Sequence, residues 1–361
     1  MRHHSGPENG TLPLYDTGPK GWIGTTGIKS ALIGAAFLAA LVSLLITLSA
    51  SNAGAARVCD KTASSNVQGL VDSLRPGQTG CLRGGVYTDK QVVFKNGGAS
   101  DANRLTLQSY PGETAEFRGG INIPEGTNFV SVSNMRLDGS YGPVETTPGK
   151  DGPRTNTAQT IKVLGGNVTI RDNNITNRRS PDLSGTCIIL GSSRTTAAKT
   201  FIEGNRIHHC GQIPRTNHEH GIYASHSVDS QVVDNLFYEN ADRGVQLFPD
   251  TRRMLVAGNV IDSNGEGLVI NDASSDNTVR NNVLSNPNDW NINRGPILSG
   301  SGNRVSDNCF WAPGGKSAFK NGGKNTSVSG NVTANPSYQD LQSLKITNRA
   351  CLAKYSGTQA R

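Results

Sequence analysis

Short apolar runs recur along the middle of the chain at a nearly constant spacing. The segments HGIYAS (220–225), RGVQLF (243–248) and EGLVIN (266–271) share one pattern, in which a glycine precedes alternating apolar residues, and their glycines lie 23 residues apart. A second repeated segment lies between them, as VVDNLFYEN (232–240) and VAGNVIDSN (256–264). Alternation with period two is typical of β-strands. Two short strands in each period of about 23 residues predict the coils of a parallel β-solenoid.

Asparagines mark one position of the repeat. The series is Asn173, Asn205, Asn235, Asn259, Asn282, Asn308 and Asn331. Stacked Asn amides hydrogen-bond to the copies above and below, and Asn tolerates the left-handed backbone of a sharp corner. The two longest steps contain insertions around 178–186 and 211–219. We therefore expect an asparagine ladder at one corner and two loops that leave the stack.

The two ends of the repeat differ from its middle. Val67, Leu70, Val71 and Leu74 recur at helical spacing before Pro76-Gly77. This predicts a short helix that covers the unpaired backbone and apolar interior of the first coil. A Gly/Pro/Thr-rich insertion occupies 139–157. From Pro336 onward the repeat stops, and the apolar residues there are expected to cover the last coil: Leu341, Leu344 and Ile346.

The N-terminal segment predicts export. Residues 1–30 lack an apolar period and are expected to be disordered, and residues 31–50 are apolar and long enough to span a bilayer. A signal peptide, with Ala53 and Ala55 as small cleavage-site residues, and an uncleaved single-pass anchor both remain open. The expected order is then a linker (51–58), the β-helix (59–351) and a C-terminal tail (352–361), in a secreted or cell-surface protein that is a monomer.

Composition adds a partner class and a redox compartment. The net charge of +7 favours an anionic partner, but no Lys/Arg run with interleaved aromatic residues points to nucleic acid. Six cysteines in an exported chain suggest disulfides: Cys59, Cys81, Cys187, Cys210, Cys309 and Cys351. Sequence does not fix their connectivity. Pairing of neighbours (59–81, 187–210, 309–351) is our expectation, because it would hold both ends of a solenoid.

The start of the repeat carries a family resemblance. A short amphipathic helix, a Pro-Gly turn, an apolar strand and the corner GGVYTD (84–89) resemble the entrance of pectate-lyase-like proteins. The period over about 60–350 is similar to that of the superfamily that holds pectate lyases, polygalacturonases, alginate lyases and mannuronan C5-epimerases. The resemblance implies an all-β, right-handed parallel β-helix with an N-terminal capping helix. It implies no single activity, because one fold hosts many chemistries.

Residues at equal positions in successive coils become neighbours, since stacked strands lie about 4.8 Å apart. Two apolar columns are expected to face the core: Ile222–Val245–Leu268 and Ala224–Leu247–Ile270. Two alternate columns are expected to face outward: Tyr223–Gln246–Val269 and Ser225–Phe248–Asn271. The column His220–Arg243–Glu266 precedes the glycines. An apolar core does not tolerate charged groups, so we expect the glycine corner to turn this column outward.

These outward columns suggest chemistry on a uronic acid. Removal of the proton α to a carboxylate requires a base and a cation that neutralises the enediolate. His220 or His218 is the candidate base, Arg243 the neutralising cation and Tyr223 the proton donor. The candidate substrate-binding residues are His226, Gln246, Asp250, Arg252 and Glu266. The alternative is a solvated polar corner in which His220 and Glu266 flank Arg243.

Family motifs do not transfer residue by residue. Polygalacturonases carry a Gly-His-Gly motif that Glu219-His220-Gly221 matches only in part, and their paired carboxylates are missing from the matching coils. Mannuronan epimerases carry Asp-Pro-His-Asp where this chain has Tyr223, Ala224, Ser225 and His226. No clear Asp cluster predicts a Ca²⁺ site. His208, His209, Cys210, His218 and His220 lie close in sequence but lack a standard zinc spacing, so no cofactor is expected, and a bound Zn²⁺ or Ca²⁺ remains the alternative.

The sequence therefore predicts an exported β-helix protein that acts on an acidic, uronate-containing polysaccharide by lyase- or epimerase-like proton abstraction. A non-catalytic β-helix that binds glycan or surface polymer, and a structural adhesin without a ligand, are the alternatives.

Overall fold

The computed structural model describes residues 59–147, 154–157, 159–180, 183–295, 297–315, 318–320 and 325–358. The predicted disordered segment (1–30), apolar segment (31–50) and linker (51–58) lie outside these residues. Within the described part of the chain, no helix is long and apolar enough to cross a membrane.

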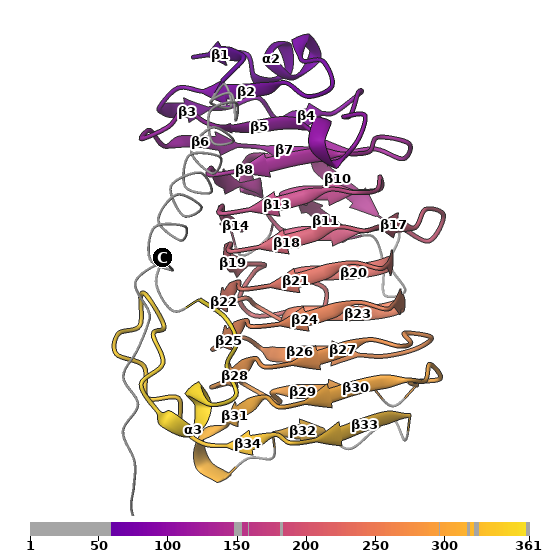
Figure 1. Ribbon diagram of the computed structural model, residues 1–361, viewed down its shortest axis with the longest axis vertical. Coiled ribbons are helices and arrows are strands. Elements are labelled where there is room, and N and C mark those ends of the chain that lie inside the picture. The colour runs from indigo at the N-terminus through magenta and orange to yellow at the C-terminus, as the bar shows by residue number, and fades with distance from the viewer. Residues whose placement is uncertain are drawn as a thin grey trace, which may run out of the picture. The chain divides into compact units, whose positions relative to one another are not determined.

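Three parallel sheets form the faces of a stack of coils (Figure 1). Sheet 1 has 11 strands, in spatial order β1 (Lys61–Ala63), β2 (Thr79–Leu82), β5 (Leu105–Ser109), β8 (Val130–Ser133), β13 (Thr169–Arg171), β18 (Phe201–Glu203), β21 (Gln231–Val233), β24 (Leu255–Ala257), β27 (Thr278–Arg280), β30 (Asn303–Ser306) and β33 (Thr326–Ser329). Sheet 2 has 11 strands: β3 (Gly85–Tyr87), β6 (Ala115–Arg118), β9 (Arg136–Asp138), β14 (Asn174–Ser180), β19 (Arg206–Cys210), β22 (Leu236–Tyr238), β25 (Val260–Asp262), β28 (Val283–Ser285), β31 (Cys309–Trp311) and β34 (Val332–Thr333), with β15 (Leu183–Ser184) beside β14.

Sheet 3 has 10 strands: β4 (Gln91–Val93), β7 (Gly120–Ile123), β12 (Ile161–Val163), β16 (Ile188–Leu190), β20 (His220–Val228), β23 (Arg243–Arg252), β26 (Glu266–Ile270), β29 (Ile292–Arg294) and β32 (Phe319–Lys320), with β17 (Ala197–Ala198) beside β20. The insertion at 139–157 contains an antiparallel hairpin, β10 (Val144–Thr147) and β11 (Arg154–Thr157). Short helical turns complete the fold: α2 (Val67–Ser73), η1 (Asp101–Asn103), η2 (Gly139–Tyr141), η3 (Pro313–Gly315) and α3 (Arg349–Leu352).

The three glycines of the repeat lie directly over one another, as predicted. The register pairs His220 with Arg243 and Arg243 with Glu266, so Gly221, Gly244 and Gly267 occupy equal positions. A Cβ atom on Gly221 would lie 2.6 Å from the carbonyl oxygen of Gly244, and one on Gly244 would lie 2.8 Å from that of Gly267. Only glycine fits this close approach of backbones. The repeat spacing therefore sets the register of the stack.

Both predicted inward columns are fully buried: Ile222, Val245, Leu268, Ala224, Leu247 and Ile270. The outward columns are less regular. Between Ala224 and His226 the partner strand β23 inserts one extra residue, because these two pair with Leu247 and Asp250. This β-bulge interrupts the predicted Ser225–Phe248–Asn271 column. Ser225 is buried rather than exposed.

The asparagine ladder runs along the corner between sheets 1 and 2. The side-chain amide of each member from Asn173 to Asn308 donates to the Oδ1 of the next, at 2.9–3.1 Å. One detail of the prediction is wrong: the left-handed residue is the one that precedes each ladder asparagine, namely Asp172, Gly204, Asp234, Gly258, Asn281, Asp307 and Gly330. Two further amide pairs, Asn240–Asn264 and Asn277–Asn303, lie at the other two corners.

The two ends are closed in different ways. Helix α2 buries Val67, Leu70 and Val71, and a Cβ on Gly80 of β2 would meet Leu70 and Leu74, so the helix packs on the first coil. The expectation for residues after Pro336 is wrong. Leu344 and Ile346 are buried against the outer face of sheet 2, in a cluster with Val260, Val283 and Cys309, and Leu341 is exposed.

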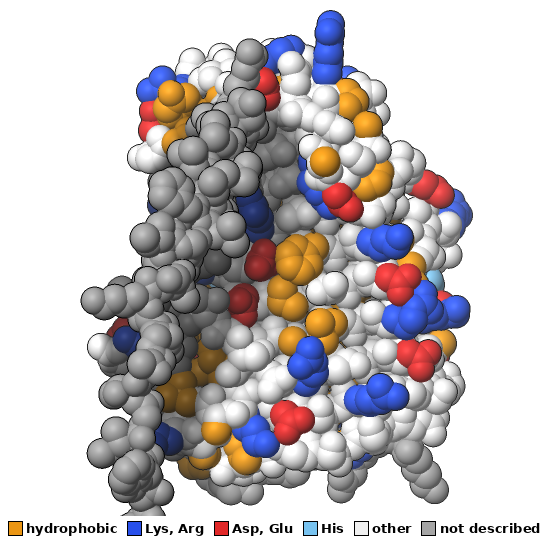
Figure 2. Space-filling view, in the orientation of Figure 1, with side chains coloured by type: hydrophobic (Ala, Val, Ile, Leu, Met, Phe, Trp, Pro, Cys, Tyr) orange, Lys and Arg blue, Asp and Glu red, His pale blue; other side chains and the backbone are white. Residues whose placement is uncertain are grey.

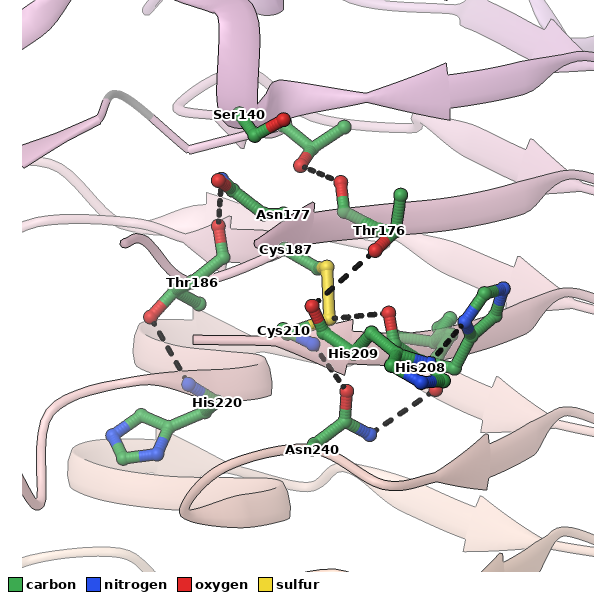
Figure 3. Close-up of a disulfide and its surroundings, with 12 residues drawn as sticks. Ser140, Thr176, Asn177, Thr186, Cys187, His208, His209, Cys210, His220 and Asn240 are labelled. Carbon is green, nitrogen blue, oxygen red and sulfur yellow. Dashed lines mark hydrogen bonds between the residues drawn. A yellow bond between two sulfur atoms is a disulfide. The ribbon is translucent and has the colours of Figure 1, made fainter. Parts of the chain in front are cut away.

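All three predicted disulfides are present: Cys59–Cys81, Cys187–Cys210 and Cys309–Cys351. Cys59–Cys81 joins the segment just before β1 to the neighbouring strand β2 in the first coils. Cys309–Cys351 ties the C-terminal segment to β31, which explains why this segment lies beside sheet 2 and not over the last coil. Cys187–Cys210 connects the start of β16 to the end of β19, and so links sheets 3 and 2 (Figure 3).

Candidate functional site

A cleft with a volume of about 740 Å³ lies on the outer face of sheet 3. Its floor comes from β20, β23, β26 and β29, and one wall comes from residues 215–218 of the predicted loop 211–219. Two bonds hold this loop across several coils. Arg215 forms an ion pair with Asp289 at 2.8 Å, and the carbonyl of Asn217 accepts a hydrogen bond from Arg243 at 3.1 Å.

The column His220–Arg243–Glu266 lines this cleft, outside the apolar core. Arg243 Nε donates to Glu266 Oε2 at 2.9 Å, and Asn293 Nδ2 donates to Glu266 Oε1 at 2.7 Å. The side chains of Arg243 and Glu266 are only 13% and 8% exposed. The guanidinium charge is thus partly compensated inside the cleft, and Arg243 is held in one orientation.

His220 is buried and neutral at neutral pH. Burial, with the nearby charges of Arg243 and His218, holds the pKa of His220 well below its usual value. Its backbone N–H donates to Thr186 Oγ1 (Figure 3), and its Nδ1 has no hydrogen-bond partner among the described residues. The ring meets that of Tyr223 edge-on, with centroids 5.6 Å apart. Burial raises the pKa of the Tyr223 phenol, which therefore stays protonated.

Sequence reasoning missed a buried carboxyl pair beside this column. Glu219 and Asp242 are each 3% exposed, and the backbone N–H of Glu219 donates to Asp242 Oδ2 at 2.9 Å. Thr216 donates to Glu219 through both its N–H and its hydroxyl. Burial raises the pKa of Asp242 to about 7, and the carboxyl side chain of Glu219 adds to this effect through its hydrogen bond and its charge, whereas the backbone N–H of Glu219 and the charge of Arg243 oppose it. Glu219 and Asp242 are 23 residues apart in sequence, the same spacing as the repeat glycines, and this spacing indicates that the two side chains are neighbours in adjacent coils.

The structure brings six of the predicted site residues to this cleft: His218, His220, Tyr223, Arg243, Gln246 and Glu266. It does not bring the other three there. Asp250 and Arg252 form an ion pair with each other at 2.7 Å and line a smaller hollow further along β23. His226 lies opposite Asp250 in the register. These three residues belong to a neighbouring surface of the same sheet.

The residues considered for zinc do not converge. Cys210 is in a disulfide, and His208 and His209 lie on β19 of sheet 2, with their Nδ1 atoms 2.8 Å apart (Figure 3). His218 and His220 lie at the cleft of sheet 3. Within the described residues, no group of three or more His, Cys, Asp or Glu side chains is arranged to hold a metal ion.

Charges of both signs are distributed over the surface. Figure 2 shows basic and acidic side chains interspersed along the right-hand side of one face. The cleft has the same mixture, with Arg215, Arg243 and Lys320 facing Asp242, Glu266 and Asp289. Local geometry, more than net charge, therefore determines what this site binds.

Comparison with known proteins supports the fold. A family model described as "Right handed beta helix region" matches residues 156–333. Pectate lyase Pel9A is similar in structure, with a TM-score of 0.58 and 11% identity over 83% of this chain and 88% of that one. The alginate lyase from Paenibacillus sp. str. FPU-7 has a TM-score of 0.40 and 13% identity over 76% of this chain and 99% of that one. The A-module of the Azotobacter vinelandii mannuronan C-5 epimerase AlgE4 has a TM-score of 0.39 and 14% identity over 76% and 96%.

A search of curated protein sequences finds no match to this chain. The family model, the stacked parallel sheets and the likeness to Pel9A agree on the class. The chain is a right-handed parallel β-helix protein with a pectate-lyase-like fold. At these identities the likeness shows the fold alone, so the activity has to be argued from the cleft.

Proposed function

We propose that this protein is exported and acts on a uronate-containing, acidic polysaccharide by lyase- or epimerase-like proton abstraction in the cleft of sheet 3. The observation that carries the proposal is His220, a buried neutral imidazole whose Nδ1 is unpartnered and lies in the same cleft as a fixed guanidinium. The three disulfides support an oxidising, extracellular location.

The proposed step starts at the carbon α to the uronate carboxylate. His220 accepts the proton from this carbon through the ring nitrogen that carries no proton, because a neutral imidazole has one such acceptor. Arg243 stabilises the negative charge that then develops on the carboxylate. His218, on the loop wall, is the alternative base. Under the proposal, His226, Asp250 and Arg252 contact sugar units beyond the cleft.

The same cleft supplies a proton to the departing or inverted centre. In elimination, the bond from C4 to the glycosidic oxygen breaks and that oxygen takes a proton, whereas in epimerisation the carbon is reprotonated from its opposite face. Asp242 suits this role better than Tyr223, because its carboxyl is partly protonated at neutral pH and is a much stronger acid than a phenol. Tyr223 then positions the sugar ring.

One observation favours the second candidate, a non-catalytic glycan-binding protein. Glu266 already compensates the charge of Arg243, and this weakens the attraction of Arg243 for a substrate carboxylate. Such a cleft binds a sugar without activating its α-proton.

Solvent exchange separates the two candidates. The purified protein is incubated in D₂O with polygalacturonate or polymannuronate, and NMR follows deuterium at C5 and formation of an unsaturated end. We expect the wild type to give one of two signals, deuterium at C5 if it epimerises or an unsaturated end if it eliminates, and we expect His220→Ala and Arg243→Ala to lose that signal. His209→Ala, which changes a histidine on sheet 2, is the control and should keep the activity. Binding of these polymers without any exchange or cleavage would contradict catalysis and establish the second candidate.

A further inference from the structure

Unpartnered polar atoms are concentrated in the cleft. Among the described residues, nine buried side-chain nitrogen or oxygen atoms have no hydrogen-bond partner. Four of these belong to cleft residues: His220 Nδ1, Gln246 Oε1, Asn271 Oδ1 and Asn293 Oδ1. Each buried unpartnered polar atom costs about 1–3 kcal/mol. Because four such atoms belong to residues of one concave site, we expect these atoms to form hydrogen bonds with a ligand.

Three of the four are amide oxygens on consecutive coils. Asn293 is 7% exposed, and its Nδ2 donates to Glu266, so its orientation is fixed and its oxygen remains an acceptor. Asn271 packs against the backbone of Gly295, where a Cβ atom would lie 2.0 Å from Asn271 Cγ. Gln246 shares one outward column with Asn293, and Val269 lies between them. The cleft thus contains three unpartnered amide oxygens, and packing or hydrogen bonding holds the side chains of Asn271 and Asn293 in place.

A group of acceptors selects ligands that donate hydrogen bonds. The donors of a polysaccharide are its free hydroxyl groups, whereas its carboxylates only accept and would be repelled by amide oxygens. The cations at the rim, Arg243 and Lys320, suit the carboxylate instead. Lys320 lies next to Asn293 in the same column, so a uronate ring can place its hydroxyls on the floor and its carboxylate at the rim.

We propose that Gln246, Asn271 and Asn293 bind free secondary hydroxyls of a sugar unit, so that the cleft rejects polysaccharide that is O-acylated at these hydroxyls. The inference rests on the proposed function, because it assigns the same cleft to a polysaccharide. An acyl ester removes the hydroxyl donor, leaves a buried acceptor unpaired and adds bulk. A site built to bind a hydroxyl discriminates strongly against an analogue that lacks it.

The test compares one sugar chain in two forms. Oligogalacturonates and oligomannuronates, each unmodified and chemically O-acetylated at O2 and O3, are titrated into the protein by calorimetry. We expect the acetylated form to bind the wild type at least about tenfold more weakly. Gln246→Leu should weaken binding of the unmodified form and reduce this discrimination, because one acceptor is lost. Gln246→Met is a second variant in case the first does not fold.

Asn122 provides a matched control. It lies in the same outward column of sheet 3, three coils before Tyr223, its Oδ1 is also unpartnered, and it is not part of the cleft. Asn122→Leu should therefore keep the discrimination of the wild type. Equal affinity of the wild type for both forms, or unchanged discrimination in the folded Gln246 variants, would overturn the inference.

Failure of the proposed function gives a different result. If neither uronate binds, the same comparison is made with plain and acetylated xylo-oligosaccharides. Tighter binding of the unmodified xylo-oligosaccharide than of its acetylated form would refute an acidic substrate, and it would support recognition of free hydroxyls by Gln246, Asn271 and Asn293. No binding to any of these chains would refute both.

Discussion

The asparagine ladder and the cleft use the same chemical group in opposite ways. Along the ladder, each side-chain amide donates to the asparagine of the next coil and accepts from that of the preceding coil, so that Asn235, Asn259 and Asn282 are fully buried and fully paired. In the cleft, the amide oxygens of Gln246 and Asn271 are buried and have no partner. The difference shows that stacking satisfies amides where every coil repeats an asparagine, and leaves their oxygens available in the cleft, where Val269 separates Gln246 from Asn293.

The largest expected effect comes from breaking the ladder. Asn259 donates to the carbonyl groups of Val232 and Ala257 and to Asn282, and accepts from both nitrogens of Asn235. Asn259→Leu keeps the branched shape of the side chain but leaves several of these groups buried without a partner, so we expect a loss on the order of 4 kcal/mol in the free energy of unfolding. Urea denaturation measures this loss. A change below about 1 kcal/mol would show that the ladder does not hold the coils together.

A smaller loss in the free energy of unfolding is expected when the Cys187–Cys210 disulfide is removed. Cys187–Cys210 joins sheet 3 near the cleft to β19, and the N–H of Cys210 donates to the side-chain oxygen of Asn240, which belongs to the Asn240–Asn264 amide pair. Replacing both cysteines with serine should cost about 3 kcal/mol, because the loop between them is no longer closed in the unfolded chain. Thermal unfolding of the oxidised double variant and wild type measures the difference. Identical midpoints would mean that the stacked coils alone fix this part of the chain.

The buried carboxyl pair predicts a dependence of stability on pH. The pKa of Asp242 is raised to about 7, so the folded state binds a proton that the unfolded chain releases near pH 4. The resulting stabilisation is complete below about pH 4 and is lost as the pH rises through about 7. Asp242→Asn mimics the protonated acid and should flatten this part of the profile, measured as melting temperature between pH 4 and 8.

Asp229 is the control for this profile. Arg253 lowers the pKa of Asp229, so its contribution has the opposite sign and is lost as the pH falls. If the pH profile of Asp242→Asn is parallel to that of the wild type, Asp242 does not bind the additional proton in the folded state.

The smallest effect is expected in the cleft itself. Gln246→Leu removes a buried acceptor that no protein group uses, so the free energy of unfolding should not fall, although ligand binding weakens. The same denaturation experiment that detects the loss in Asn259→Leu measures this change. A cost as large as that of the ladder variant would show that Gln246 is structural.

Repetition explains which features the sequence predicts. The stacked glycines, the inward columns and the ladder follow from residues that recur every coil, since equal positions must superpose. The disulfide pairing agrees with the neighbour rule, although the rule itself does not exclude other pairings. The sequence also allows the Glu219–Asp242 pair to be predicted, because both residues lie two positions before a repeat glycine.

Features that occur once are harder to predict. The bulge after Ala224 has no counterpart in the next coils, so the expected Ser225 column does not form. The segment after Pro336 lies along sheet 2 because Cys351 ties it to Cys309 and because Leu344 and Ile346 find apolar partners there. No periodic pattern in the sequence indicates which face such a segment covers.

Side-chain amide NMR tests the contrast between the two regions most directly. Spectra of protein labelled with ¹⁵N at asparagine and glutamine side chains are recorded while an unmodified oligouronate is titrated in. We predict that the signals of Gln246, Asn271 and Asn293 shift with the ligand, whereas those of Asn235, Asn259 and Asn282 stay in place. Shifts confined to the ladder, or a bound ligand that leaves the three cleft amides unchanged, would contradict the account.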